Sequence, residues 1–566
     1  MKYLYNIAKK YKFLIAVYIV MGLLQSFLQS FGSSYFQRVI DNFTNNDLTI
    51  LNIVIYGVVM ISLYIISYLD EYPWRKLEHG IFLNLKINAL RKISVIDYLE
   101  YVKIGTGTLI QQIENGASAG GGILFNFYLR IISELLPAMI FSFIFIFTIN
   151  RVVAVTILSG YIVVFIITNL LLKILYKFKE NILVNEEKFN HFLVRGFMEM
   201  VVFRVNRRFP GEIKKTETAA GEIISNKVKM SLIHEAFFAV FAILVGFIKI
   251  GIIAYGWSTK NLTIGAIVAL IALVENAYTP IAIFNVLYVQ YKLDKVAFER
   301  YTDFLDAKED SRLTQGILLS DISGDIAFSQ VAFKYNERVI LQDLNLGIEK
   351  GKTIAFVGES GSGKSTVVKL LAGLLQPDSG CITIDGIRLA EINLNSFYQY
   401  IAYLSQEPPV FNGTLRENLI FDDKIDDSLL LEALKQTGLW TLYEQLENGL
   451  DTPLGERGVS LSGGERQQLA LARLWFTGAN VIIFDEATSA IDNLTENIVM
   501  ENVMTLLAGK TVIAIAHRLD SIKSFDQIIL FQDGHIAEQG NFEELLGRRS
   551  HFHELYFRNR QSTLQK

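Results

Sequence analysis

The sequence contains almost no cysteine: Cys381 is the only one among its 566 residues. A single thiol excludes an intrachain disulfide framework and any zinc or iron–sulfur site built from several cysteines. Charged residues are also scarce, at 19% against about 25% in an average soluble domain. Because 51% of the residues are hydrophobic, a disordered chain is excluded and an entirely water-soluble enzyme is disfavoured. The net charge of −4 leaves no basic footprint, so nucleic acid is not expected as a partner.

The apolar surplus lies almost entirely before residue 300. Six stretches there approach or exceed the ~20 residues that a helix needs to cross about 30 Å of hydrocarbon. They are roughly residues 13–33, 53–69, 131–149, 152–175, 237–255 and 262–288. Six such stretches could not share one soluble core, so we predict an α-helical membrane domain of six transmembrane helices over residues 1–301.

Positively charged residues in the connections predict the orientation in the membrane. They gather in the long connections after the second and fourth stretches, whereas the other connections carry one each: Arg38, Arg151 and Lys260. This asymmetry predicts that both termini and the second half of the chain are cytoplasmic. The single cysteine and the short outer connections favour a bacterial plasma membrane.

The second half of the chain has a different composition. Residues 302–324 are acidic and polar, and we expect them to form a linker. From residue 325 to 566, short β-branched runs such as TIAFVG and VIIFDE alternate with helical patterns, which predicts an α/β domain.

A glycine-rich loop in this half fits the phosphate-binding pattern G-x-x-x-x-G-K-[ST]. A predicted strand precedes it and a predicted helix follows it, which is the context that the pattern requires. Its residues are Gly358, Glu359, Ser360, Gly361, Ser362, Gly363, Lys364, Ser365 and Thr366. We expect the backbone amides to surround phosphate, Lys364 to reach the β- and γ-phosphates, and the Ser365 hydroxyl to bind Mg²⁺.

Two further patterns point to the same chemistry. An apolar strand ends in Asp485 and Glu486, where Asp485 would hold Mg²⁺ and Glu486 would polarise an attacking water. A second anion-binding pattern opens a helix but lacks a lysine. It consists of Leu461, Ser462, Gly463, Gly464 and Glu465. One chain thus offers two phosphate sites, of which only one is complete.

The order of these motifs resembles that of the ATP-binding cassette (ABC) transporters. The phosphate loop, Gln406, the LSGGE motif, the Asp485-Glu486 pair and His517 follow one another as in that family. The resemblance covers the whole chain and implies a half-subunit of the exporter type, in which six spans precede an α/β P-loop cassette. Segments 98–105 and 196–208 fall where that fold docks its coupling helices on cassettes.

The resemblance also implies roles for single residues. Tyr335 would stack on adenine, Gln406 would sense Mg²⁺ and contact the membrane half, and His517 would act as a switch on the γ-phosphate. Asp492 falls in the loop between paired cassettes, and residues 455–458 match an element typical of exporters. The LSGGE motif, where LSGGQ is commoner, would act on the nucleotide of a second cassette. ATP, Mg²⁺ and a second half-transporter, identical or paralogous, are therefore implied.

Polar residues inside the spans are candidates for a cargo cavity. They are Gln25 and Gln29, which share one helix face, and Glu134, Lys249 and Glu275. The structural alternatives are pairing of Glu134 with Arg130, and either pairing of Lys249 with Glu275 or extension of the Lys249 ammonium group outward to the membrane surface. The remaining lining is expected to be aromatic and aliphatic, rich in phenylalanine, which suits bulky amphipathic cargo.

The expected function is an ATP-hydrolysing translocase that exports hydrophobic or amphipathic compounds, namely a drug, a lipid or a peptide. One alternative keeps the fold and imports metal–siderophore complexes, and no feature of the sequence decides between the two directions. An ATP-gated channel or a regulatory subunit is a third possibility, against which the presence of Glu486 and His517 argues.

Overall fold

The computed structural model describes residues 1–198, 200–420, 425–455, 461–516 and 518–564; the side chains of residues 161–177 and of scattered further positions lie outside this description. The chain divides into two compact units. The first comprises Met1–Ser94 and Ile104–Ala307, and the second comprises Val95–Lys103 and Lys308–Lys566.

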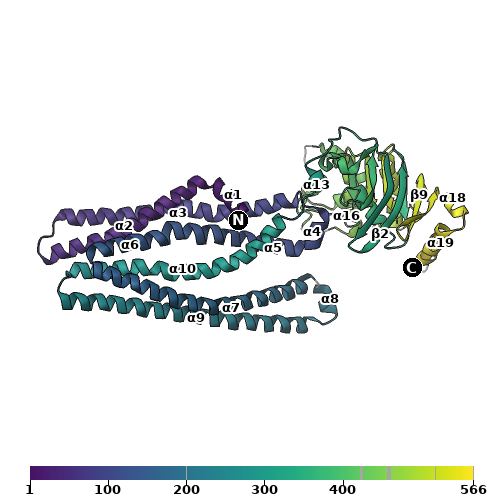
Figure 1. The fold of residues 1–566 in the computed structure, drawn as a ribbon. Helices are drawn as coiled ribbons and strands as arrows, with labels where there is room; N and C mark the ends of the chain where they lie inside the picture. The colour runs from purple at the N-terminus through teal and green to yellow at the C-terminus, as the bar shows by residue number, and fades with distance from the viewer. Residues whose placement is uncertain (199, 421–424, 456–460, 517, 565–566) are drawn as a thin grey trace. The chain divides into compact units, whose positions relative to one another are not determined.

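The first unit consists of helices (Figure 1). In chain order they are α1 (Lys2–Lys10), α2 (Lys12–Thr44), α3 (Ile50–Ile93), α5 (Thr106–Gly121), the π-helical turns η1 (Gly122–Leu129) and η2 (Ile131–Leu135), α6 (Leu136–Ile149), α7 (Arg151–Met198), α8 (Met200–Val205), α9 (Phe209–Thr259) and α10 (Ile264–Leu305). Helices α7 and α9 run side by side, and the short α8 lies at the turn between them.

Five helical segments among the described residues are long and apolar enough to cross a membrane. They are Lys12–Thr44, Ile50–Ile93, Gly107–Ile149, Phe209–Thr259 and Ile264–Leu305. In the most apolar window of α3 only 6% of the residues are buried inside the protein, and an apolar surface of that extent fits lipid better than water. The sixth predicted stretch, 152–175, falls in α7, where most of its side chains lie outside the described residues.

The helices are much longer than the predicted stretches, because each continues into a more polar extension. Helix α10 runs to Leu305, so the first residues of the expected linker are helical. After α10, Arg312 forms a buried ion pair with Asp310 and donates to the carbonyl oxygen of Gly373 at 2.7 Å, so this stretch is held against the second unit. The expected linker is thus packed rather than free.

A short segment from the first half belongs to the second unit. Helix α4 spans Tyr98–Ile104, and Tyr98 and Leu99 pack against a hydrophobic core of the second unit. The backbone amide of Asp97 donates to the carbonyl of Lys308 at 3.0 Å. Residues 98–103 of the segment expected to dock on a cassette therefore belong to this chain's own second unit.

The second unit is an α/β domain with two sheets. A four-stranded antiparallel sheet has the order β2 (Arg338–Ile348), β1 (Ile326–Tyr335), β4 (Ser379–Ile384), β5 (Ile387–Arg388). A six-stranded sheet has the order β10 (His535–Gly540), β9 (Gln527–Gln532), β3 (Thr353–Val357), β8 (Thr511–Ile515), β7 (Val481–Asp485), β6 (Ile401–Leu404).

The helices of this unit are mostly short. They are α11 (Lys364–Leu371), α12 (Leu394–Phe397), α13 (Leu415–Leu419), α14 (Asp427–Gln436), α15 (Trp440–Glu444), α16 (Gly463–Ala472), α17 (Asn493–Leu506), α18 (Phe542–Gly547) and α19 (His551–Leu564), with 3₁₀ turns η3 (Ser311–Leu313), η4 (Leu389–Glu391), η5 (Gly449–Asp451) and η7 (Arg473–Phe476).

Strand β3 lies inside the six-stranded sheet and has both faces buried. Ile354 and Phe356 point into the core shared with the antiparallel sheet, and Ala355 and Val357 point into the opposite core. All strands of this sheet except β10 are parallel, so their carboxyl ends meet at one edge. The loops that follow β3, β6, β7 and β8 therefore start side by side.

Candidate functional site

The phosphate loop connects β3 to α11, and its shape depends on glycine. Gly358 has φ 141°, and a Cβ there would lie 2.2 Å from the carbonyl oxygen of Phe531. Gly363 has φ 107°, and a Cβ there would lie 2.8 Å from Leu341. Only residues without a side chain fit these two positions, so the close approach of the loop to its neighbours is built into the sequence.

The side chain of Lys364 lies across this loop. Its ammonium group donates to the carbonyl oxygens of Gly358 at 2.9 Å and Glu359 at 2.8 Å. Burial lowers the pKa of Lys364, while the negative charges of Glu486 and Asp485 act in the opposite direction. The lysine is thus positioned by backbone oxygens at the place where phosphate oxygens are expected.

The loops after β6 and β7 bring the predicted catalytic residues together. The amide of Gln406 donates to Glu486 at 2.7 Å, although 80 positions separate the two residues in the chain. Glu486 has φ 55°, a left-handed conformation that is unfavourable for a residue with a side chain. Asp485 accepts a hydrogen bond from the hydroxyl of Tyr403 at 2.8 Å. Burial is the main cause of the raised pKa of Tyr403, so this hydroxyl stays protonated and donates.

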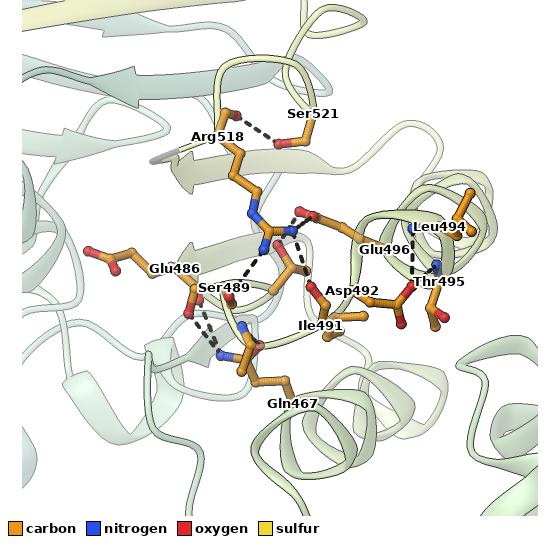
Figure 2. Close-up of polar contacts among 12 residues, drawn as sticks. Gln467, Glu486, Ser489, Ile491, Asp492, Leu494, Thr495, Glu496, Arg518 and Ser521 are labelled. Carbon is orange, nitrogen blue, oxygen red and sulfur yellow. Dashed lines mark hydrogen bonds and ion pairs between the residues drawn. The ribbon is translucent and has the colours of Figure 1, made fainter. Parts of the chain in front are cut away.

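Gln467, on α16, connects the loops that follow β6 and β7. Its side chain donates to the carbonyl of Gln406 and to the hydroxyl of Ser489, both at 3.2 Å. Its carbonyl oxygen accepts from the backbone amide of Ala490 at 2.8 Å. Figure 2 shows Gln467 beside Glu486 and Ser489. The sequence analysis missed this residue and also missed Tyr403.

The loop around Asp492 is held within its own chain (Figure 2). Asp492 caps α17 by accepting from the amides of Leu494 at 3.1 Å and Thr495 at 3.0 Å. The hydrogen bond from Thr495 is the main cause of its lowered pKa. Arg518 pairs with the buried Glu496, donates to the carbonyl of Ile491, and so fixes the same loop from the other side. Asp492 therefore has a capping role besides the expected one between cassettes.

The LSGGE motif forms the start of α16. Ser462 and Glu465 make a reciprocal capping box: the Ser462 amide donates to Glu465 at 2.6 Å, and the Glu465 amide donates to the Ser462 hydroxyl at 3.2 Å. A Cβ on Gly464 would lie 3.0 Å from the carbonyl of Ala490. Leu461 is buried in the core beside it. The carboxylate of Glu465 thus makes a capping hydrogen bond at the position where glutamine is commoner.

The other predicted residues of the nucleotide site are placed as follows. Tyr335 ends β1 and makes an edge contact with Phe333 at a ring distance of 4.8 Å. Ser365 is exposed and Thr366 is buried at the start of α11. His517 and residues 456–458 lie outside the described residues.

The predicted cargo residues separate into two groups. Gln25, Gln29 and Glu134 line one cavity of the first unit. Lys249 and Glu275 are not among its lining residues; they pair with each other at 2.8 Å, as the structural alternative foresaw. The described lining of this cavity contains no phenylalanine, in contrast to the expectation. Beside glutamine, asparagine, serine and charged residues it includes the aromatic Tyr18 and Trp74 and the apolar Leu135, Ala138, Pro280 and Ile283.

Part of the chain matches a known protein family, and several known proteins are similar to it in sequence. Residues 341–489 match the family model described as ABC transporter. The chain is 33% identical over 360 residues to an uncharacterized ABC transporter ATP-binding protein of Bacillus subtilis, which covers 62% of this chain and 60% of that protein. It is 33% identical over 341 residues to the ATP-dependent lipid A-core flippase of Alcanivorax borkumensis, covering 59% and 57%. The matches thus span less than two thirds of these relatives.

A solved structure extends the likeness to both units. The structure of a bacterial Atm1-family ABC exporter with ATP bound matches with a TM-score of 0.82, at 22% identity, over 97% of this chain and 98% of that one. The chain has the fold of an exporter-type ABC half-transporter. The second unit, which contains residues 341–489, accordingly has the cassette fold, and the first unit, with its five helical segments long and apolar enough to cross a membrane, has the fold of that exporter's membrane domain.

The cassette also fits a magnesium ion. Proteins hold Mg²⁺ through one or two carboxylates together with substrate phosphates and water. Ser365, near the start of α11 after β3, and Asp485, at the end of β7, offer such oxygens at the same edge of the sheet. Within the described residues, no group of three or more histidine, cysteine or acidic side chains could hold a metal ion by itself. The donor set thus suits an ion that takes most of its ligands from nucleotide and water.

Proposed function

We propose that this chain is one half of an ATP-driven exporter that moves hydrophobic or amphipathic compounds, such as a drug, a lipid or a peptide. One observation carries the proposal: a complete phosphate loop with Lys364 and a lysine-free LSGGE motif occur in one cassette. A nucleotide held by the phosphate loop of one chain would be completed by Ser462 of another. A second half-transporter, identical or paralogous, is therefore part of the proposal.

The geometry supports a role for each residue in hydrolysis. Lys364 binds and neutralises phosphate oxygens. Ser365, Gln406 and Asp485 would hold a magnesium ion, which would supply further charge neutralisation. Glu486 accepts a proton from the attacking water. The hydrogen bond from Gln406 to Glu486 keeps that carboxylate at the carboxyl edge of the sheet.

The proposal also covers two further residues of the nucleotide site and the location of the chain in the cell. Tyr335 stacks on adenine, and His517 contacts the γ-phosphate. The chain resides in a bacterial plasma membrane with both termini and the cassette in the cytoplasm. Support comes from the charge asymmetry of the connections and from the likeness to a flippase that, by its name, acts on lipid A-core.

The test is ATP hydrolysis and particle mass of the full chain in lipid nanodiscs. We expect a dimer-sized particle that hydrolyses ATP, and a Glu486→Gln variant that still binds ATP but hydrolyses it at least a hundredfold more slowly, within the range for loss of general-base catalysis. Full activity in the Glu486→Gln variant contradicts the assigned base. A wild-type particle that binds no ATP contradicts the proposal as a whole.

A further inference from the structure

A polar cavity of about 610 Å³ lies within the first unit. It is bounded by α2, α3, α10 and the π-helical turns η1 and η2. Its polar and charged lining consists of Gln25, Ser26, Gln29, Ser30, Ser67, Asp70, Glu71, Asn126, Arg130, Ser133, Glu134, Asn276 and Thr279. Hydrogen-bonding groups of this number inside an apolar helix bundle point to a polar ligand.

The helices are shaped to open this space. Two π-helical turns, η1 and η2, follow each other where Asn126 and Glu134 face the cavity, and such turns recur at functional sites. Gly22 of α2 packs directly against η2, because a Cβ there would lie 2.2 Å from the carbonyl oxygen of Ser133. The shape of the cavity is therefore determined by the backbone, namely by the π-helical turns and by the close helix contact at Gly22.

The charges in the wall do not balance. Glu134 pairs with Arg130 at 2.8 Å, and Glu71 pairs at 2.8 Å with Arg75, which lies outside the lining. Asp70 is different, because its Oδ1 atom is buried and has no hydrogen-bond partner among the described residues. One negative charge thus remains in the cavity, and it belongs to Asp70.

An uncompensated carboxylate in such a place is unfavourable unless something pairs with it. The neighbouring amides of Gln25 and Gln29 carry no charge to compensate it, and their described hydrogen bonds go to Ser67 at 3.5 Å and Asn276 at 3.1 Å. Two aromatic residues, Tyr18 and Trp74, add apolar surface to the same wall. A ligand that fits has a positive charge, hydrogen-bond donors and a flat apolar part.

We propose that the cargo of this half-transporter is an organic cation, whose ammonium or iminium-type group is bound by Asp70. The proposal rests on the proposed export function and narrows its cargo from amphipathic compounds in general to cationic ones. It also replaces the expected phenylalanine-lined site, because the charge of the cavity selects cargo by its sign.

The test compares two dyes of one shape and opposite charge. Rhodamine 123 is a cation with amino groups, and fluorescein is an anion with the same three-ring frame and pendant phenyl ring. Binding of each dye to the full chain in nanodiscs is measured by fluorescence anisotropy without nucleotide, with empty nanodiscs subtracted. The variants are Asp70→Asn, which removes the charge, Asp70→Glu, which keeps it, and Glu299→Gln as matched control. Glu299 is an exposed carboxylate on α10 that pairs with Lys295.

We expect rhodamine 123 to bind at least tenfold more tightly than fluorescein. Asp70→Asn should weaken rhodamine binding about tenfold, as the loss of one charge-assisted contact predicts, whereas Asp70→Glu and Glu299→Gln should retain it. Equal affinity for the two dyes, or unchanged rhodamine binding in Asp70→Asn, overturns the inference. Because binding is measured without ATP, failure of the cargo inference is distinguishable from failure of the export function, which shows as absent ATP hydrolysis. If Asp70→Asn does not fold, the comparison of the two dyes on the wild-type chain still decides.

Discussion

Gln467 offers a direct test of how hydrogen bonds between loops support ATP hydrolysis. It bonds to the loops that follow β6 and β7, and no hydrogen bond among the described residues joins its side chain to the phosphate loop. We predict that Gln467→Leu lowers the rate of ATP hydrolysis at least tenfold while the Kd for ATP changes less than about twofold. Leucine has nearly the volume of glutamine, so the substitution removes hydrogen bonds and leaves packing almost unchanged.

The expected loss of thermal stability follows from the hydrogen bonds that the substitution removes. Gln467 makes three good hydrogen bonds, at 2.8, 3.2 and 3.2 Å, and a fourth contact of 3.5 Å that is too long to count. Each of the three contributes about 1 kcal/mol net, and the buried leucine regains part of the total. A net loss of about 2 kcal/mol corresponds to a fall of about 4–8 °C in the thermal midpoint of a domain of this size.

The neighbouring Gln468 provides the matched control. It is also buried, and the described part of the chain shows no hydrogen bond from its side chain. Gln468→Leu should therefore leave hydrolysis and thermal midpoint nearly unchanged. Full-chain protein in nanodiscs serves for all three measurements: hydrolysis, binding of a fluorescent ATP analogue, and thermal unfolding. Equal effects of the two substitutions, or a Gln467→Leu variant with normal turnover, refute the reasoning.

Three further predictions address neighbouring residues. Lys364→Ala should weaken binding of a fluorescent ATP analogue at least tenfold, because it removes the cation that backbone oxygens hold over the loop; unchanged affinity contradicts its role. Tyr403→Phe should raise the Mg²⁺ concentration for half-maximal hydrolysis several-fold, since Asp485 loses an orienting hydrogen bond; an unaltered Mg²⁺ titration contradicts that link. Burial acts to raise the pKa of Asp526, but hydrogen bonds from Thr353 and the Lys352 ammonium outweigh it and hold the pKa below the ordinary 3.8. The stability that the ionised Asp526 contributes is therefore present above pH 3.8 and is lost as the pH falls through the lower pKa of the folded state. On acidification below pH 3.8, the thermal midpoint of the wild-type protein should therefore fall more than that of Asp526→Asn.

The sequence predicted those parts of the site that consist of short, contiguous motifs. The phosphate loop needs only its own residues and the strand and helix beside it, so its location and shape followed from the pattern. Gln467, Tyr403 and Arg518 carry no such pattern, because they act on partners that are distant in the chain; Tyr403 reaches Asp485 across 82 positions. A signal for Arg518 was present in its position next to His517, since a residue beside a predicted site residue shares its loop.

The cavity could not be predicted from composition for a different physical reason. In a membrane domain both the lipid-facing and the packed surfaces of a helix are apolar, so hydropathy does not show which face turns inward. The phenylalanines of α2 illustrate this. Phe27 and Phe31 stack at 5.8 Å and contact Phe145, at a place that is not part of the cavity wall. The glutamines four positions apart, by contrast, were a usable signal, because polar groups in a span have few other places to go.

The capping box at the start of α16 bears on how two cassettes would share one nucleotide. Ser462 uses a lone pair of its hydroxyl to accept the Glu465 amide, and this leaves its O–H free to donate to a phosphate. The carboxylate of Glu465 is occupied by the Ser462 amide, so the extra negative charge is directed at the helix start and not at the incoming nucleotide. Gly463 and Gly464 lie against Ala490, in the loop that Gln467 and Arg518 hold. The LSGGE motif is therefore already formed within one chain, and pairing of two chains requires no refolding at this end of the site.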